Sequence, residues 1–199
     1  MKATMHAPTR LLLIDDDRLV LATVGGGLRT AGYDTLHAES AEEAESLLAR
    51  GLRPDLAIVD IRMAGQSGLA LARRLRELDH IPFVMFSACR EQALVEEANA
   101  LGALAYLVKP LDVAQMIPII AAALARAREL QSLRDTRAQL QGALDADRDM
   151  SVAIGITMAR ERLSRQAAFE RLRREARNAR CRLSQLASDL VAALERQCT

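Results

Sequence analysis

Aromatic residues are scarce in this 199-residue chain, at 3% of the sequence, with two Tyr, three Phe and no Trp. A surface that stacks the bases of single-stranded nucleic acid on aromatic rings is therefore hard to build. Cysteine is also rare, and Cys89, Cys181 and Cys198 show neither a CxxC motif nor the spacing of metal ligands. We interpret these three as ordinary residues of a protein in a reducing compartment.

Long apolar runs are missing as well. No stretch reaches 18 consecutive apolar residues, so the sequence predicts no membrane-spanning helix. Residues 1–10 lack the apolar segment of a secretory signal, and we expect a cytoplasmic protein. Half of the residues are hydrophobic and the formal net charge is +1, which is typical of a folded chain with a buried core. The length suits one domain followed by a smaller one.

The charges that are present are unevenly distributed. Residues 1–110 hold 12 basic and 15 acidic side chains, whereas residues 151–199 hold 10 basic and 5 acidic ones. All ten basic residues of the second range are arginines. The C-terminal part therefore carries a net positive charge, whereas the N-terminal part carries a net negative one, and the positive charge suits a polyanionic partner.

Residues 10–110 alternate short apolar runs with amphipathic stretches. Near-continuous apolar runs of four residues predict strands that are covered on both faces of a parallel sheet. The expected strands are residues 11–14, 35–36, 56–59, 83–86 and 105–108, and the expected helices are 17–31, 41–50, 68–78 and 90–101. With a fifth helix, this alternation predicts a doubly wound α/β fold of five parallel strands within the first 125 residues.

Two features disturb that pattern. Gly25, Gly26 and Gly27 fall inside the first expected helix, where each glycine costs about 1 kcal/mol relative to alanine. This run lacks the lysine of a GxxxxGK[ST] motif and the spacing of GxGxxG, so we do not interpret it as a phosphate-binding loop. Pro118 is expected to kink the fifth helix or to delay its start.

The rest of the chain is predicted to be helical. A long helical linker is expected over residues 119–148, where apolar residues and two arginines recur on alternating three- and four-residue steps. This heptad seam could pair with a second copy as a marginal coiled coil or dock back on the first domain, and we favour the homodimer. The seam consists of Ile119, Ala123, Arg126, Leu130, Leu133, Arg137, Leu140 and Leu144.

Three further helices are expected in residues 149–199, at about 149–161, 165–178 and 182–196. Rich in small residues, they predict a small all-α three-helix bundle. The expected organisation is thus an α/β domain in residues 1–125, the helical linker 119–148 and the bundle 149–199.

Polar side chains follow four of the five expected strands, at the edge where open α/β sheets bind ligands. Asp15 and Asp16 follow the first strand, Asp60 the third, Ser87 the fourth and Lys109 the fifth. Clustered carboxylates repel one another, and oxygen ligands of this kind suit Mg²⁺. Each residue alone has an ordinary structural explanation, such as a helix cap, and only their joint arrangement predicts a site.

Within that site, Asp60 is the best candidate for a nucleophile that attacks phosphorus, because it stands alone on the central strand. Asp16 would hold the metal, with Asp15 binding it directly or through water. The Ser87 hydroxyl and Lys109 would then contact the oxygens of the transferred phosphoryl group.

Four segments, LLLIDDDRLV, PDLAIVDIRMAGQSG, FVMFSA and GALAYLVKPL, resemble the receiver domains of two-component response regulators over about residues 9–125. The resemblance implies a flavodoxin-like fold and a phosphoryl group accepted at Asp60 from a sensor histidine kinase. It implies contacts to the phosphoryl group from Ser87 and Lys109, and a cis bond before Pro110, which proline makes less costly. The ligands it implies for Mg²⁺ are Asp15, Asp16, Asp60 and the main-chain carbonyl of Arg62.

The same resemblance implies that Tyr106 changes position when Ser87 moves to the phosphoryl group. Ala64 stands where the family often has proline, a departure expected to affect only a loop. Such a domain catalyses only its own phosphorylation and dephosphorylation, so we do not expect an enzyme.

The segment SVAIGITMARERLSRQAAFERLRREARNARCRLSQLASDLVAAL resembles the ANTAR module, the three-helix RNA-binding output of transcription antitermination regulators. The resemblance implies binding to stem-loops in nascent leader RNA, which favours an antiterminator over a terminator hairpin. Two residues depart from the family pattern: Ile154 replaces a usual basic residue, and Arg162 replaces a frequent glycine.

Arginines crowd the end of the second helix of this segment and the turn after it. Arginine can bridge phosphates and stack on unpaired bases, which suits RNA loops where aromatic residues are scarce. Two alternatives stay open, a DNA-binding response regulator and a protein-binding signalling adaptor. The candidate RNA contacts are Arg171, Arg173, Arg174, Arg177, Arg180 and Arg182.

Overall fold

The computed structural model describes residues 8–197, so Cys198 and the first seven residues of the expected α/β domain lie outside the described range. The chain divides into two compact units, Met1–Leu130 and Gln131–Thr199. Among residues 8–197, no helix combines the length and the apolar character that a membrane crossing requires.

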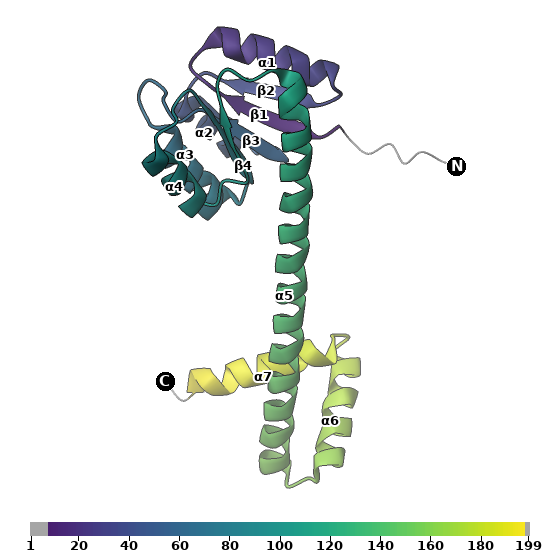
Figure 1. The fold of residues 1–199 in the computed structure, drawn as a ribbon. Helices are drawn as coiled ribbons and strands as arrows, with labels where there is room; N and C mark the ends of the chain where they lie inside the picture. The colour runs from purple at the N-terminus through teal and green to yellow at the C-terminus, as the bar shows by residue number, and fades with distance from the viewer. Residues whose placement is uncertain (1–7, 198–199) are drawn as a thin grey trace, which may run out of the picture. The chain divides into compact units, whose positions relative to one another are not determined.

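The first unit is built on one sheet of five parallel strands in the order β2-β1-β3-β4-β5 (Figure 1). The strands are β1 (Arg10–Ile14), β2 (Asp34–Ala38), β3 (Leu56–Val59), β4 (Phe83–Ser87) and β5 (Tyr106–Val108). In register, Leu12 of β1 lies between Leu36 of β2 and Ala57 of β3. This strand order is the flavodoxin-like one, so the expected doubly wound sheet is confirmed.

Helices cover both faces of this sheet, which explains why β1, β3 and β4 are apolar over most of their length. Leu12 and Ile14 point into the core under α2, α3 and α4, whereas Leu11 and Leu13 point into the core under α1 and α5. All four of these side chains are buried. The helices are α1 (Arg18–Thr30), α2 (Ala41–Ala49), α3 (Gly68–Arg74), α4 (Gln92–Ala100) and α5 (Val113–Glu161).

Helix α3 is shorter than the expected helix 68–78, because its last part is a π-helical turn, η1 (Leu75–Asp79). The fully buried Leu75 begins this turn, and its carbonyl accepts a hydrogen bond from the Ile81 amide. The end of the element is therefore set by tertiary packing that the helical pattern does not contain.

Helix α1 runs through the triple glycine without interruption, and close packing explains two of its three members. A β-carbon on Gly25 would lie 2.1 Å from Nε2 of His37, and one on Gly27 would lie 2.7 Å from a methyl group of Val113. Gly26 has nothing within 4 Å of that position. Gly25 and Gly27 thus allow α1 to lie close to β2 and to the start of α5, although glycine lowers the stability of a helix.

The second unit contains the last part of α5 together with α6 (Arg165–Asn178) and α7 (Leu183–Gln197). Ser164 caps α6 by accepting a hydrogen bond from the Ala167 amide at 3.3 Å. Buried side chains from all three helical segments form one core, comprising Ala153, Ile154, Ala168, Leu172 and Ala187. Residues 149–161 are the end of α5 and not a separate helix, and α5 begins at Val113, so Pro118 does not delay its start.

The heptad seam is divided between two environments. Ile119 and Ala123 pack into the core of the first unit under the sheet. Leu133, Leu140 and Leu144 are instead 58%, 62% and 66% exposed. The part of the seam that is free to contact a second copy therefore starts beyond the sheet, on the exposed stretch of α5.

Candidate functional site

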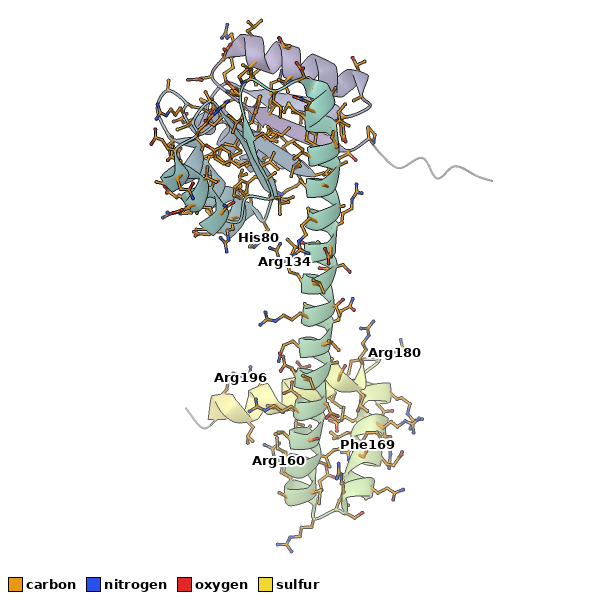
Figure 2. The ribbon with its side chains drawn as sticks, in the orientation of Figure 1. His80, Arg134, Arg160, Phe169, Arg180 and Arg196 are labelled. Carbon is orange, nitrogen blue, oxygen red and sulfur yellow. The ribbon has the colours of Figure 1, made fainter. Side chains whose placement is uncertain are left out.

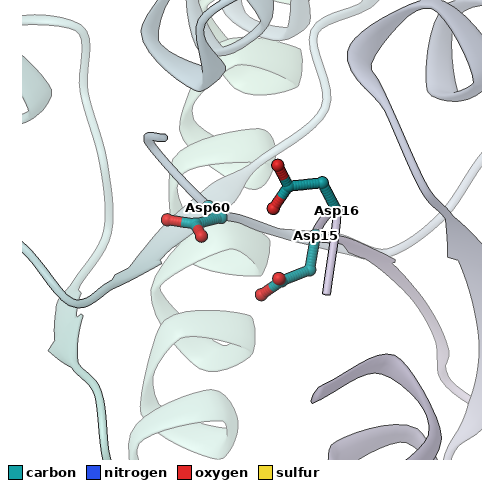
Figure 3. A group of neighbouring side chains, drawn as sticks. All are labelled: Asp15, Asp16 and Asp60. Atoms are coloured by element: carbon teal, nitrogen blue, oxygen red, sulfur yellow. The ribbon is translucent and has the colours of Figure 1, made fainter. Parts of the chain in front are cut away.

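Three carboxylates meet at the carboxyl edge of the sheet (Figure 3). Asp15 directly follows β1 and is 1% exposed, and Asp60 directly follows β3 and is 7% exposed. Asp16 is exposed, and one carboxylate oxygen from each of the three residues lies within 4.8 Å of the others. The structure thus brings together the three acidic residues that the strand-end pattern singled out.

Backbone amides hold the carboxylates of the β1–α1 loop in place. Asp15 accepts a hydrogen bond from the Asp17 amide at 3.0 Å, and Asp17 itself caps α1 by accepting from the Leu19 amide at 2.8 Å. Asp16 accepts from the Ala64 amide at 2.9 Å. Proline has no amide hydrogen to donate, so the departure at Ala64 reaches a candidate metal ligand and not only a loop.

Lys109, directly after β5, bridges two of the three carboxylates. Its Nζ donates to Oδ2 of Asp15 at 2.5 Å and to Oδ2 of Asp60 at 2.7 Å. The bond between Lys109 and Pro110 is cis. The ammonium therefore already offsets part of the repulsion between the carboxylates, so a metal ion is not the only cation that can hold them together.

Burial and ion pairing act in opposite directions on these groups. Burial raises the pKa of Asp15, although the hydrogen bonds from Lys109 and from the Asp17 amide oppose that shift. For Lys109, burial disfavours the charge, but the hydrogen bonds to Asp15 and Asp60 outweigh it and raise the pKa. Lys109 is consequently a firmly charged group beside the Asp60 carboxylate.

Gly68 is a residue of this site that sequence reasoning missed. It begins α3, and its amide donates to the Ile61 carbonyl at 3.0 Å. A β-carbon there would lie 1.8 Å from the main-chain oxygen of Asp60 and 2.8 Å from its carbonyl carbon. Because Gly68 has no side chain, the backbone of α3 can lie in close contact with the backbone of Asp60. The glycine is visible in the segment GQSG, but the sequence does not show which atoms lie next to it.

Ser87 and Tyr106 are linked through the loop that follows β4. Ser87 is 1% exposed, and its Oγ accepts from the Cys89 amide at 3.4 Å. The Tyr106 hydroxyl donates to the Cys89 carbonyl at 2.8 Å. Ser87 and Tyr106 thus both bond to the backbone of Cys89, and their coupled movement stays a prediction.

Arg62 contributes to the edge in two ways. Its amide donates to Oδ1 of Asp60 at 3.3 Å, and its guanidinium pairs with Glu91 at 2.8 Å. The β3–α3 loop is thereby tied to the β4–α4 loop across the site. The assignment of the Arg62 carbonyl as a metal ligand stays a prediction.

The donor set fits a hard divalent cation. It consists of carboxylate oxygens, two of them on buried residues, at an edge that Asp16 leaves open to solvent. Mg²⁺ prefers such oxygen donors and keeps several waters, for which an exposed side is needed.

In the second unit, the six candidate arginines fall into two groups. Arg171 pairs with Glu161 at 3.3 Å and with Glu175 at 3.6 Å, and Arg173 pairs with Glu170 at 3.6 Å. The other four form no ion pair within the described part of the chain and are exposed; they are Arg174, Arg177, Arg180 and Arg182. The unpaired positive charge thus gathers at the end of α6 and in the turn to α7.

Ile154 lies in the core of this unit and is only 8% exposed. At this position the chain therefore has an apolar side chain that contributes to packing.

Comparisons with known proteins agree with these features. The family model described as "Response regulator receiver domain" matches residues 11–121, and the model of the ANTAR domain matches residues 138–191. The transcriptional regulatory protein PdtaR of Mycobacterium tuberculosis is 30% identical over 193 residues, which cover 96% of this chain and 94% of that protein. The chemotaxis protein CheY of Treponema pallidum is 32% identical over 121 residues, 59% of this chain and 84% of that protein.

A solved structure shares the fold of the first unit. The signal receiver domain of a modulated diguanylate cyclase from Desulfovibrio desulfuricans G20 matches with a TM-score of 0.57 and 29% identity, covering 61% of this chain and 98% of that one.

Proposed function

Since the chain belongs to the response regulators that join a receiver domain to an ANTAR domain, we propose that it is a phosphorylation-controlled RNA-binding protein that promotes transcription antitermination. The input is the edge of the sheet around Asp60, and the output is the arginine-rich unit formed by the end of α5, α6 and α7. The strand-end cluster carries the first half of this proposal, and the unpaired arginines beside α6 carry the second.

The proposed reaction is phosphoryl transfer to Asp60 from a phosphohistidine of a sensor histidine kinase. An Oδ atom of Asp60 attacks phosphorus, a P–O bond forms, and the P–N bond breaks with its electron pair left on the imidazole. The Lys109 ammonium, 2.7 Å from Asp60, stabilises the negative charge of the transferred group. The protein acts on no separate substrate, because the product is its own aspartyl phosphate.

The carboxylates of Asp15, Asp16 and Asp60, with the carbonyl of Arg62, are the proposed ligands of Mg²⁺. When bound, the ion would neutralise phosphoryl oxygens and lower the barrier to attack by a carboxylate. The side chains of Asp15 and Asp17 accept hydrogen bonds from backbone amides, so the β1–α1 loop is preorganised for binding the ion.

Signal transmission is proposed to start at Ser87. When its hydroxyl turns to the phosphoryl group, it gives up the hydrogen bond from the Cys89 amide. The Cys89 carbonyl moves with that loop, and the Tyr106 hydroxyl that bonds to it changes position. The receiver surface around β4 and β5 is then altered, which favours pairing with a second copy.

A homodimer through α5 would carry this change to the output. Leu133, Leu140 and Leu144 are exposed and recur on heptad steps, so two copies of the helix would bury them against one another. A pair of output units could then bind paired stem-loops in a nascent leader RNA.

RNA is favoured over duplex DNA by the surface of α7. A recognition helix for the major groove needs side chains that reach base edges and phosphates. The exposed surface of α7 includes Ser184, Gln185 and Asp189, and the Gln185 side chain donates a hydrogen bond to Asp189 at 3.0 Å. These three residues bring no positive charge for contact with phosphates. The positive charge lies at α6 and the turn after it.

A competition experiment tests the proposed output. Protein phosphorylated with acetyl phosphate is titrated against the hairpin that it enriches from an RNA pool with a randomised loop, and against the same hairpin with a scrambled loop. We expect at least tenfold tighter binding to the enriched hairpin at physiological salt, with a duplex DNA of the same length bound no better than the scrambled RNA. Equal affinity for the two hairpins would refute RNA recognition, and tighter binding to the duplex DNA than to either hairpin would support the DNA-binding alternative.

A further inference from the structure

Two turns of the second unit place an arginine in a backbone conformation that normally belongs to glycine. Arg162 follows α5 with a φ of 54°, and Arg180 follows α6 with a φ of 52°. At both turns the amide of the next residue reaches back five residues, from Leu163 to the Met158 carbonyl and from Cys181 to the Ala176 carbonyl. This is the Schellman pattern of a helix end, in which the left-handed residue is usually glycine.

The first unit uses glycine wherever this helix end occurs. After α1, α2 and α4 the left-handed residues are Gly32, Gly51 and Gly102, with φ values of 94°, 92° and 86°. A β-carbon in this region crowds the following carbonyl, so arginine is less stable there than glycine. Among the described residues, the helix ends with this pattern thus carry glycine three times and arginine twice, and His80 after η1 is the one further left-handed residue with a side chain (His80 and Arg180 are labelled in Figure 2).

Local interactions do not explain the two arginines. His80, the other left-handed residue with a side chain, places its Nδ1 3.0 Å from the Arg76 carbonyl. Within residues 8–197, the guanidinium groups of Arg162 and Arg180 form neither a hydrogen bond nor an ion pair, and both residues are exposed. The Schellman hydrogen bonds would form equally well with glycine, so they do not account for the arginines, and left-handed residues with a side chain cluster at functional sites.

We propose that Arg162 and Arg180 are two nucleic-acid contacts, one at each end of α6, that bind different phosphates of the RNA. The proposal rests on the proposed function. Helix α6 has 14 residues and is about 20 Å long, so the two side chains are too far apart to share a phosphate. Arg174 and Arg177, exposed and unpaired, lie between them on α6 and extend the same basic surface.

Only Arg180 was among the residues expected from charge clustering. Arg162 lies outside the cluster 171–182, between Arg160 and Arg165. We include Arg162 among the proposed contacts because of its left-handed conformation. The replacement of the family's frequent glycine by arginine would then serve RNA binding.

The test compares binding and stability in the full-length protein. The probe is the fluorescein-labelled hairpin enriched from the randomised pool. For Arg162→Gly we expect a dissociation constant about fivefold higher and a salt slope reduced by about one, because one phosphate contact is lost. Its Tm should be equal to that of the wild type or higher, since glycine relieves the left-handed backbone.

Arg180→Gly should behave in the same way, and the double variant should bind about 25-fold more weakly, because contacts that far apart contribute independently. Arg162→Asn provides an uncharged residue that tolerates the left-handed region, and it should lose binding to the same extent. Arg134→Gln removes an exposed charge from α5 outside the matched ANTAR range and is the control, with both affinity and salt slope unchanged.

Two results would overturn the proposal. If the Gly and Asn variants keep the wild-type affinity and salt slope, the arginines do not contact the RNA, whatever the Tm, and the proposed function is untouched. A lower Tm would then show that they only cap helices by interacting with the helix dipole. If the wild type itself does not distinguish the enriched hairpin from the scrambled one, the proposed function fails and this inference fails with it.

Discussion

At the scale of single residues, two groups that carry no charge help to shape the candidate site, in addition to the Lys109 ammonium that bridges Asp15 and Asp60. Asp16 is fixed by the amide of Ala64, and the backbone of Asp60 lies against Gly68. The acidic residues and Lys109 could be predicted from the sequence, because each stands at the end of an apolar run. The roles of Ala64 and Gly68 could not, because an amide hydrogen and a missing β-carbon leave no mark in a pattern of polar and apolar residues.

Substitution of Gly68 by alanine tests the second of these contacts. The new β-carbon would overlap the carbonyl of Asp60, so either α3 or the Asp60 backbone must shift. We expect the free energy of unfolding to fall by about 2 kcal/mol, as for overpacked sites, and the rate of phosphorylation by acetyl phosphate to fall several-fold. Urea denaturation and a phosphorylation time course measure the two effects.

Gly26→Ala is the matched control for that variant. It has nothing within 4 Å of the new methyl group and lies inside a helix, so it should raise the stability by up to about 1 kcal/mol and leave phosphorylation unchanged. A Gly68→Ala protein as stable and as reactive as the wild type would show that the close approach to Asp60 is unimportant.

At the scale of elements, α5 differs most from what the sequence suggests. The heptad pattern of apolar residues does not distinguish a helix face that packs on the sheet of its own chain from one that packs on a second copy of the helix. The structure assigns Ile119 and Ala123 to the first environment and leaves Leu133 and Leu140 exposed. The helix continues without a break from residue 148 to residue 149 and into the second unit, where separate segments were expected.

Introducing a charge at Leu140 tests the proposed coiled coil. Leu140→Lys places an ammonium at a seam position that is 62% exposed in the single chain, so the fold should be unaffected. In the phosphorylated dimer the same group would be buried, and we expect at least a tenfold higher dissociation constant for dimerisation. Sedimentation velocity of the phosphorylated proteins measures this constant.

Gln139→Lys adds the same charge at the neighbouring exposed position, outside the seam, and serves as control. It should dimerise as the wild type does. Identical behaviour of Leu140→Lys and wild type would place the dimer interface elsewhere.

At the scale of the whole molecule, the chain joins a cluster of carboxylates in its first unit to a basic surface in its second unit. The carboxylates lie at the edge of the sheet in Met1–Leu130, and the unpaired arginines lie in Gln131–Thr199. The sequence predicted both halves, the first from residues at strand ends and the second from the charge asymmetry and the resemblance to ANTAR. It could not predict which arginines are free, since the pairs of Arg171 and Arg173 with glutamates depend on helix geometry.

The most direct test of the account is whether Asp60 controls RNA binding. Wild-type protein and Asp60→Asn are each titrated with the enriched hairpin, before and after treatment with acetyl phosphate and Mg²⁺. We predict that treatment tightens binding of the wild type by about tenfold, which corresponds to about 1.4 kcal/mol of coupling, and leaves Asp60→Asn unchanged. If treatment changed neither protein, or tightened binding of both equally, Asp60 would not be the input that governs the arginine-rich output.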